Sequence, residues 1–313
     1  MTTALQVVDG VDLSGKTCVI TGASSGLGRE SARALATAGA HVVLTGRNPR
    51  SLADAQKWVH DEVPQALTST VHLDLASLTS VRAAAAAIQD EFPAIHVLMN
   101  NAGVMFTPLR RTGDGFEIQF GTNHLGHFEL TRRLIPQLVA ADGARVVILS
   151  SGGHVMGDVN FDDPNWETRE YDKFIAYGAS KTANILHMVE LDRRLRDAAV
   201  HAYCVHPGTV ATSLARHMTR DDFAMLRRLA SENIDRNEPP DFRRDFVMPE
   251  QGAATQVWAS VSQALADIGS VYLEDCRISD AVAPYALDEE RARRLWDLSA
   301  DLCDCIASDC IRA

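Results

Sequence analysis

The stretch Thr17-Cys18-Val19-Ile20-Thr21-Gly22-Ala23-Ser24-Ser25-Gly26-Leu27-Gly28 decides the fold of this chain. Its apolar first half predicts a buried strand, and a helical pattern begins at Leu27, within the glycine-rich turn. Glycine lets a backbone approach a ligand closely, and the N–H groups that open a helix favour a bound phosphate. The glycines are separated by three residues and then by one, which departs from the G-x-G-x-x-G pattern. Such a turn after the first strand of an alternating series predicts a dinucleotide site.

The same turn also satisfies G-x-S-x-G, the pattern of the nucleophile elbow in α/β-hydrolases. That alternative would make Ser24 a nucleophile and would need a downstream acid and histidine, for which His206 is a candidate. It leaves the other motifs unexplained, and an elbow on the first strand would lie unusually early. We expect the dinucleotide site and keep the serine hydrolase as an alternative.

Strand-like apolar runs alternate with helical patterns along most of the chain. The expected strands are Thr17–Thr21, His41–Thr45, Ser69–Leu73, Ile95–Met99, Arg145–Leu149 and Val200–Val205. The expected helices are Leu27–Ala38, Pro49–His60, Ser77–Glu91, Phe116–Val139 and a segment from about Tyr177 to Arg196. This alternation favours a parallel sheet with helices on both faces. We expect one α/β domain over residues 1–313, a Rossmann-type doubly wound parallel sheet of about seven strands in the order 3-2-1-4-5-6-7.

Composition narrows the class of partner. The chain has 313 residues and a formal net charge of −11, which argues against nucleic acid or an anionic membrane surface as a partner. No apolar run approaches the roughly 18 residues of a membrane span, and Met1–Gly15 lacks the features of a signal peptide. We expect a cytoplasmic protein without a membrane span.

Two segments and the C-terminus interrupt the alternation. Gly152–Ala176 and residues 211–249 are long excursions of the kind that often form lids or binding loops, although peripheral helices would also fit. We expect residues 211–249 to be a substrate loop and residues 286–313 to be a C-terminal tail. Three cysteines lie in that tail, at positions Cys303, Cys305 and Cys310. Their spacing matches no standard zinc pattern, so we expect a mobile thiol-rich end and no metal site.

The residues after the second strand bear on the type of dinucleotide. A carboxylate at this place would bind the 2′-hydroxyl of the NAD ribose, but the sequence there is Thr45-Gly46-Arg47-Asn48. Arg47 can pair with a 2′-phosphate, so NADP(H) is favoured over NAD(H). The alternative is that Arg47 is only a solvated loop charge.

A tyrosine and a lysine provide the candidate chemistry. Tyr177 and Lys181 lie four residues apart on an expected helix and therefore share a face. A free phenol titrates near pH ~10, and a cation held nearby lowers its pKa. The pair predicts proton transfer and hence an enzyme.

With these residues assembled, the chain resembles the short-chain dehydrogenase/reductase family from about Lys16 to Tyr285. The family's motifs occur in order and are specific in combination. They are Thr21–Gly28, Asp74-Leu75, Asn100-Asn101-Ala102-Gly103, Asn123, Ser150-Ser151, Tyr177 with Lys181, and Pro207-Gly208.

Within the family, the chain is most similar to the retinol-dehydrogenase-like branch. The long gap between Ser151 and Tyr177 is one common feature. The others are Gly46-Arg47-Asn48, Asn123-His124-Leu125-Gly126-His127-Phe128, Pro249-Glu250-Gln251-Gly252-Ala253-Ala254 and Tyr272-Leu273-Glu274-Asp275-Cys276. The chain is expected to differ from the membrane-bound members in lacking a hydrophobic anchor, so the resemblance does not by itself make a retinoid the substrate.

The resemblance implies four catalytic residues. Tyr177 transfers a proton to or from the substrate oxygen, and Lys181 lowers the pKa of Tyr177 and binds the nicotinamide ribose. Ser151 donates a hydrogen bond to the carbonyl, and it is preferred over Ser150 because the family's second serine faces the site. Asn123 holds a water of the proton relay through its backbone.

The resemblance also implies two sets of binding residues. Those for the cofactor are Gly22, Ser24, Ser25, Gly26, Leu27, Gly28, Arg47, Asn48, Asp74, Leu75, Asn101, Ala102, Gly103, Tyr177, Lys181, Pro207, Gly208, Val210 and Thr212. Those for the substrate are Met105, Phe106, Gly153, Met156, Phe174 and Leu214. Simpler alternatives are that Asp74 caps a helix and that Asn123 is an ordinary helix residue. Packing or surface roles are expected for His124, His127, His154 and His206.

The expected function is reversible hydride transfer between NADP(H) and the alcohol or carbonyl group of a fairly apolar small molecule. The alternative from another class is an NADP(H)-binding regulatory protein without turnover. A homodimer paired through the helices Phe116–Val139 and Phe174–Arg196 is a further expectation from the family.

Overall fold

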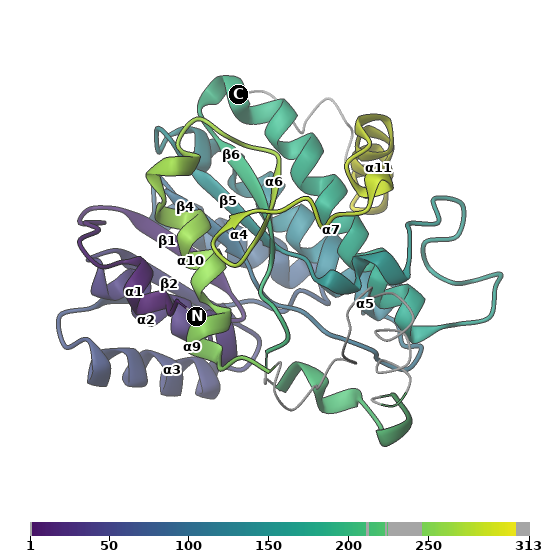
Figure 1. The fold of residues 1–313 in the computed structure, drawn as a ribbon, viewed down its shortest axis with the longest axis horizontal. Coiled ribbons are helices and arrows are strands. Elements are labelled where there is room, and N and C mark those ends of the chain that lie inside the picture. The colour runs from purple at the N-terminus through teal and green to yellow at the C-terminus, as the bar shows by residue number, and fades with distance from the viewer. Residues whose placement is uncertain (1, 211–212, 223, 225–245, 305–313) are drawn as a thin grey trace, which may run out of the picture.

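In the computed structural model, which describes residues 2–210, 213–222, 224 and 246–304, eight strands form one sheet (Figure 1). Their order is β3-β2-β1-β4-β5-β6-β7-β8. They are β1 (Thr17–Thr21), β2 (His41–Gly46), β3 (Leu67–His72), β4 (Val97–Asn100), β5 (Arg145–Leu149), β6 (His201–His206), β7 (Val271–Glu274) and β8 (Arg277–Ile278). The Rossmann-type sheet and the order of its parallel strands are confirmed.

The eighth strand is the difference from the expected seven. β8 pairs antiparallel with β7 through the two-residue turn Asp275-Cys276. Both residues have positive φ, 50° and 55°, as a tight two-residue hairpin turn requires. The strand is only two residues long, which is too short to produce the apolar run from which a strand is predicted.

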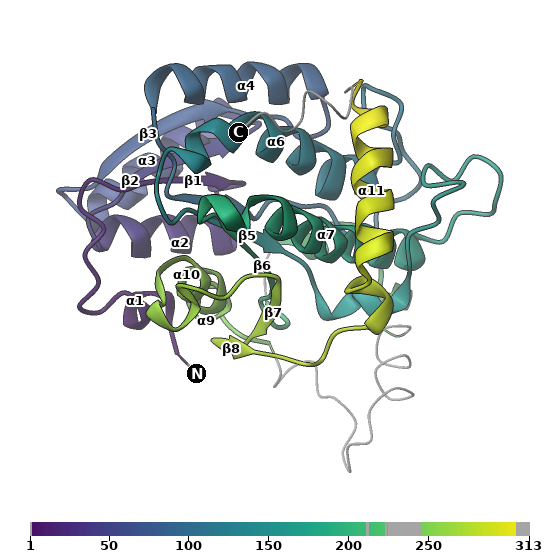
Figure 2. The same ribbon diagram turned by 90° about the horizontal axis from the view of Figure 1, so that it is seen from above.

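Helices cover both faces of the sheet (Figure 2). One face carries α4 (Leu78–Glu91), α6 (Gly126–Val139), α7 (Lys173–Leu195) and α11 (Glu289–Leu302). The other carries α1 (Ala4–Val7), α2 (Gly26–Thr37), α3 (Pro49–Glu62) and α10 (Ala254–Val261). The strands between them alternate: Val19 packs toward the first set, and Cys18 and Ile20 toward the second. The remaining helical turns are α5 (Ile118–Phe120), η1 (Gly121–Leu125), η2 (Gly152–Met156), η3 (Arg196–Ala198), η4 (Ser213–His217), α9 (Pro249–Gly252), η5 (Gln263–Leu265) and η6 (Pro284–Ala286).

The long helix expected over Phe116–Val139 is interrupted. A π-helical segment, Gly121–Leu125, separates α5 from α6. Glycines bound it on both sides: a Cβ on Gly121 would lie 2.6 Å from Thr112 Cγ2, and one on Gly126 would lie 2.4 Å from the Leu75 carbonyl oxygen. The helix is therefore pressed against distant loops at both positions. Such π segments occur often at functional sites, and this one contains Asn123.

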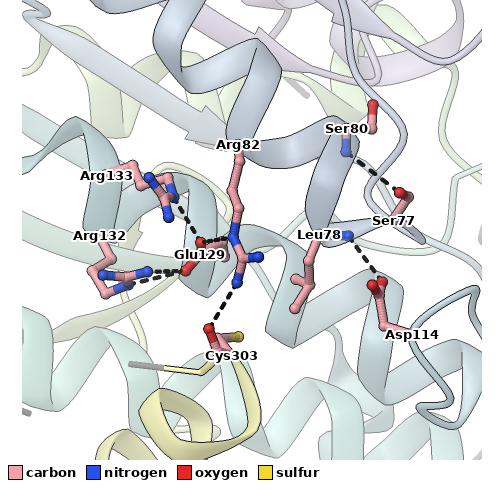
Figure 3. Close-up of polar contacts among 9 residues, drawn as sticks. All are labelled: Ser77, Leu78, Ser80, Arg82, Asp114, Glu129, Arg132, Arg133 and Cys303. Carbon is pink, nitrogen blue, oxygen red and sulfur yellow. Dashed lines mark hydrogen bonds and ion pairs between the residues drawn. The ribbon is translucent and has the colours of Figure 1, made fainter. Parts of the chain in front are cut away.

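The expectation of a mobile thiol-rich tail is wrong for Cys303. Residues Glu289–Leu302 form α11, whose apolar face packs against α7. Cys303 is buried, and its carbonyl oxygen accepts a 2.9 Å hydrogen bond from Arg82 Nη2 (Figure 3). Cys305 and Cys310 lie outside the described residues.

Figure 3 shows the ion-pair cluster that anchors α4 to α6. Glu129 is buried, and its carboxylate forms ion pairs with the guanidinium groups of Arg82, Arg132 and Arg133. Burial raises the pKa of Glu129, but the hydrogen bonds from the three arginines outweigh it, so the net pKa is lowered. Arg82 also reaches Cys303, so the same cluster attaches the end of α11.

Candidate active site

The glycine turn joins β1 to α2 and has no room for larger residues. Gly22 has φ +65°, in the left-handed region. A Cβ on Gly28 would lie 2.5 Å from the Gly22 carbonyl oxygen and 2.6 Å from Asn101 Nδ2. Gly26 opens α2, and the side chain of the N-cap residue Ser25 makes no capping hydrogen bond. The turn thus has the close-packed form and helix N-terminus expected at a phosphate site.

Hydrogen bonds tie the carboxyl ends of β1 and β4 together. Thr21 Oγ1 accepts from the backbone N–H groups of Asn101 (2.9 Å) and Ala102 (3.0 Å). Asn101 Nδ2 donates to the Thr21 carbonyl oxygen at 2.7 Å. Gly103 follows, and a Cβ there would lie 3.1 Å from Asn123 Oδ1 and 3.7 Å from Lys181 Nζ. The turn after β4 therefore connects the glycine turn to the candidate catalytic residues.

Several of the residues predicted to bind the cofactor make hydrogen bonds or packing contacts within the protein. Asn48 caps α3, with Oδ1 accepting from the N–H groups of Arg50 and Ser51. Asp74 accepts from the Ala76 N–H at 3.0 Å, and Ser77, not Asp74, caps α4. Leu75 is buried in the core. Arg47 is exposed at the end of β2.

The residues after β6 contact the glycine turn from the other side. Gly208 has φ +81°, and Val210 forms a β-bridge with Val247. Val210 and Leu27 both lie against Gly252, where a Cβ would be 2.6 Å from Val210 Cγ2 and 2.8 Å from Leu27 Cδ2. Pro207 precedes this group, and Thr212 lies outside the described residues.

Ser151 and Tyr177 come together beside Gly153. The Ser151 hydroxyl hydrogen-bonds the phenol of Tyr177, and a Cβ on Gly153 would be 3.1 Å from Tyr177 Cε1 and 3.3 Å from Ser151 Oγ. Ser151 Oγ also accepts from the Gly153 N–H at 3.0 Å. Ser150 Oγ instead donates to the Lys181 carbonyl oxygen at 3.0 Å. Of the two serines, Ser151 is therefore the one beside the phenol.

Lys181 is buried on the same face of α7. Its Nζ lies 5.7 Å from the centre of the Tyr177 ring and donates to the Leu149 carbonyl oxygen at 3.1 Å. Asn184 Nδ2 donates to the same carbonyl at 2.9 Å. Burial lowers the pKa of Lys181 to about 8.

The expected lowering of the Tyr177 pKa by Lys181 is not found in this structure. Burial raises the pKa of Tyr177 to about 12, and the hydrogen bond from Ser151 offsets only part of that rise. The reason is that the phenol is buried away from water, which disfavours the phenolate. The phenol is thus protonated at neutral pH.

Asn123 is not an ordinary helix residue. Its side chain is buried, donates from Nδ2 to the Val104 carbonyl oxygen and to Ser180 Oγ (both 2.9 Å), and accepts the Val104 N–H at 2.8 Å. Its backbone carbonyl oxygen accepts from His127 Nδ1 at 2.9 Å. Ser180 Oγ in turn donates to the Tyr177 carbonyl oxygen at 2.8 Å, which links the π segment to α7.

Apolar residues lie around Tyr177 and Gly153. Phe106 packs on both Phe174 and Tyr177, with ring centres 4.7 Å and 4.9 Å apart. Met156 Cε lies 2.8 Å from where a Gly153 Cβ would be. Met105 and Leu214 are half-buried. A cavity of about 300 Å³ lies further out and is lined by Pro108, Tyr171, Asp172, Lys173 and Phe174.

Some residues that organise the site were not predicted. Gln119 accepts the Phe106 N–H at 2.7 Å and donates to Tyr171 Oη and the Lys173 carbonyl oxygen, both at 3.0 Å. Ser180 lies three residues after Tyr177, so helical spacing alone could have suggested it. Gln119 carries no comparable signal, because its partners are distant in sequence.

The structure argues against the alternative in which Ser24 and His206 form the active site of a serine hydrolase. Ser24 follows β1, His206 ends β6, and β4 and β5 lie between these strands. Neighbouring strands are about 4.8 Å apart, so the two residues are too distant for a nucleophile–histidine pair. His206 instead approaches Glu274, with Nε2 3.9 Å from Oε1.

We searched the described residues for membrane-spanning helices and for metal-binding clusters. No helix there is long and apolar enough to cross a membrane. Within the same ranges, no group of three or more histidine, cysteine or acidic side chains could hold a metal ion. His124, His127 and His154 are buried and hydrogen-bonded to other protein groups.

Comparison with known proteins agrees with this arrangement. The sequence model of the family described as short chain dehydrogenase matches residues 16–222. Human retinol dehydrogenase 13 is 40% identical over 290 residues, covering 93% of this chain and 85% of that protein. Mouse retinol dehydrogenase 14 is 39% identical over 298 residues, covering 92% and 85%.

Solved structures agree as well. A crystal structure of an uncharacterized protein from Mycobacterium paratuberculosis is 33% identical, with a TM-score of 0.74, and covers 96% of this chain and 97% of that chain. The NADP complex of RhlG from Pseudomonas aeruginosa, 22% identical with a TM-score of 0.63 over 84% and 96%, has the same fold. The chain therefore belongs to the short-chain dehydrogenase/reductase family, in its retinol-dehydrogenase-like branch.

Proposed function

We propose that this protein catalyses reversible hydride transfer between NADP(H) and the alcohol or carbonyl group of a fairly apolar small molecule, with Tyr177 as general acid and base. One observation carries the proposal: a buried phenol, hydrogen-bonded by the Ser151 hydroxyl, lies on the same helical face as a buried lysine. The four family residues Asn123, Ser151, Tyr177 and Lys181 are the catalytic set.

The chain's own residues position the substrate oxygen and move its proton. The nicotinamide supplies or accepts the hydride. In reduction, the carbonyl oxygen lies within hydrogen-bond reach of Ser151 and Tyr177, and Tyr177 donates its proton as charge develops on that oxygen. A phenol with a pKa of about 12 is in the protonated form that this step needs. In oxidation, Tyr177 must first be the phenolate in order to accept the proton, and burial disfavours that phenolate.

Lys181 provides positive charge where water is excluded. Its pKa of about 8 leaves the ammonium charged at neutral pH. Its Nζ lies close to Gly103, where a Cβ would be 3.7 Å away. We propose that it binds the ribose of the cofactor and favours the phenolate when Tyr177 ionises. Asn123 supports the same proton path through its backbone.

The preference for NADP(H) rests on two guanidinium groups. Arg47 follows β2, where an NAD-specific carboxylate would stand, and Gly46 provides none. Arg216, in the excursion after β6, has its pKa lowered by burial and by the charge of Arg47. The two guanidinium groups are thus close enough to interact electrostatically, which suits a dianionic 2′-phosphate between them.

The substrate is proposed to be apolar around its reactive group. Phe106 packs on the Tyr177 ring and on Phe174, and Met156 lies beside Gly153. The relatives at 40% and 39% identity are named retinol dehydrogenases. A fairly apolar alcohol or carbonyl compound therefore suits this side of the site. The cavity beside Phe174 leaves room for the remainder of such a molecule.

A panel of apolar aldehydes, ketones and alcohols, read by absorbance of NADPH and separately of NADH, tests the proposal. We expect turnover with NADPH at much lower cofactor concentration than with NADH. Arg47→Asp should reduce the NADPH preference by about tenfold or more, because it replaces an attractive charge with a repulsive one. NADPH binding without turnover across the panel would favour a regulatory protein instead.

A further inference from the structure

His154 lies between Ser151 and the C-terminal part of the chain. It belongs to η2, directly after the serine, and its side chain is completely buried. Its Nδ1 is 2.8 Å from the Ser151 carbonyl oxygen, and its Nε2 is 3.0 Å from the backbone nitrogen of Ala283. One ring therefore connects two segments that are 129 residues apart.

The partners determine the form of the ring. A carbonyl oxygen only accepts hydrogen bonds, so Nδ1 must carry the proton. A backbone N–H only donates, so Nε2 must be the acceptor. The neutral ring satisfies both contacts, and neither nitrogen is available for a metal ion or a substrate.

The backbone of His154, like its ring, makes hydrogen bonds to two other parts of the chain. Its carbonyl oxygen accepts from Thr182 Oγ1 and from Tyr285 Oη, both at 3.1 Å. Nearby, Asp158 pairs with Arg291 Nη2 at 2.6 Å. The loop that carries Ser151 is thus clamped between α7 and residues 283–291.

We propose that His154 is a positioning residue whose Nδ1–H orients the Ser151 peptide, and with it the hydroxyl beside Tyr177. This inference rests on the proposed function, because it assigns His154 a role in that reaction. The Ser151 side chain is held by the Gly153 N–H. Its carbonyl oxygen accepts from His154 Nδ1 at 2.8 Å and from the His154 backbone N–H at 3.1 Å, so loss of the Nδ1 contact leaves one hydrogen bond in place of two and loosens the orientation of the peptide.

Two conservative variants separate the contacts. In His154→Asn the amide can replace Nδ1–H and keep the bond to Ser151, but it cannot reach Ala283. In His154→Gln the amide oxygen can replace Nε2 and keep the bond to Ala283, but the donor to Ser151 is lost. Asp158→Asn is the matched control, because it weakens the attachment of the C-terminal segment without touching the serine.

The measurements are kcat and KM with NADPH and an active carbonyl from the panel, the Kd for NADPH, and Tm. We expect His154→Gln to lower kcat about tenfold, a part of the 100-fold or greater loss typical when such a donor is removed. We expect kcat for His154→Asn and Asp158→Asn within about threefold of wild type, with NADPH affinity unchanged in all three. The pH profile of kcat should shift to more alkaline pH only in His154→Gln, because Ser151 then hydrogen-bonds the phenol less well.

Equal kcat for His154→Gln and wild type, or equal losses in both histidine variants that follow Tm, would overturn the positioning role while leaving the proposed function intact. Failure of the wild-type protein itself to turn over any substrate would refute the proposed function and this role with it.

Discussion

Replacing Lys181 with methionine should make the cofactor-free protein more stable while it abolishes turnover. Burial lowers the pKa of this lysine from 10.5 to about 8, and each pKa unit is worth about 1.4 kcal/mol, so holding the charged ammonium in the core costs about 3 kcal/mol. Methionine has a similar length and no charge to desolvate. The variant loses the hydrogen bond to the Leu149 carbonyl oxygen, worth about 1 kcal/mol, although Asn184 still satisfies that oxygen. The net gain is about 2 kcal/mol at pH 7.

The pH dependence distinguishes this mechanism from simple repacking. A lysine with a lowered pKa destabilises the folded state fully below its folded value of about 8, and the effect disappears as the pH rises through its unfolded value of 10.5. The stability advantage of Lys181→Met should therefore shrink steadily between pH 8 and pH 10.5.

Urea unfolding at several pH values, without cofactor, measures this difference. Lys57→Met is the control, because Lys57 is largely exposed and should change stability by less than about 1 kcal/mol at any pH. A Lys181→Met protein that is less stable than wild type at pH 7, or whose advantage does not depend on pH, would refute the reasoning.

Three further substitutions test other parts of the structure. Ser151→Ala should lower kcat by about 100-fold with little change in NADPH affinity, measured by steady-state kinetics and fluorescence titration, and an unchanged kcat would exclude the serine from the reaction. Gly28→Ala should weaken NADPH binding by about tenfold or more in the same titration, since its Cβ would lie 2.5 Å from the Gly22 carbonyl oxygen. Glu129→Gln should cost about 3 kcal/mol in urea unfolding at pH 7. The difference from wild type should diminish as the pH falls from 4.5 through the lower pKa of the folded state, because the unfolded wild-type carboxylate binds a proton before the folded one does.

The parts of the fold that could be predicted are those in which local sequence and tertiary structure agree. All six expected strands overlap observed ones, and four of them agree to within one residue at each end. Buried parallel strands such as Arg145–Leu149 are continuously apolar and so are visible in the sequence. The π segment could not be predicted, because it depends on contacts of Gly121 and Gly126 with Thr112 and Leu75, which helical periodicity does not report.

For the C-terminal helix, the sequence contained a signal for its start but none for its burial. A start signal was present in the sequence, since Asp288 caps α11 and Glu289 and Glu290 follow it. The burial of Cys303 was not visible, because it depends on packing against α7 and on the hydrogen bond from Arg82 (Figure 3).

In the candidate site, too, features set by local sequence could be predicted and features set by tertiary contacts could not. Four-residue spacing correctly placed Tyr177 and Lys181 on one face of α7, since helix geometry is local. It gave the wrong direction for the Tyr177 pKa in this structure, because burial depends on residues such as Phe106 that come from other parts of the chain. Asn48 caps α3, which the sequence analysis did not predict, and its role in cofactor binding stays a prediction.

The central claim is that the buried phenol of Tyr177 transfers the proton. The most direct measurement compares single-turnover reduction by enzyme-bound NADPH in wild type and Tyr177→Phe, with NADPH affinity measured in parallel. We predict that the rate falls by at least about 100-fold while the Kd for NADPH stays within about threefold of wild type. A Tyr177→Phe protein that oxidises NADPH at the wild-type rate would contradict it.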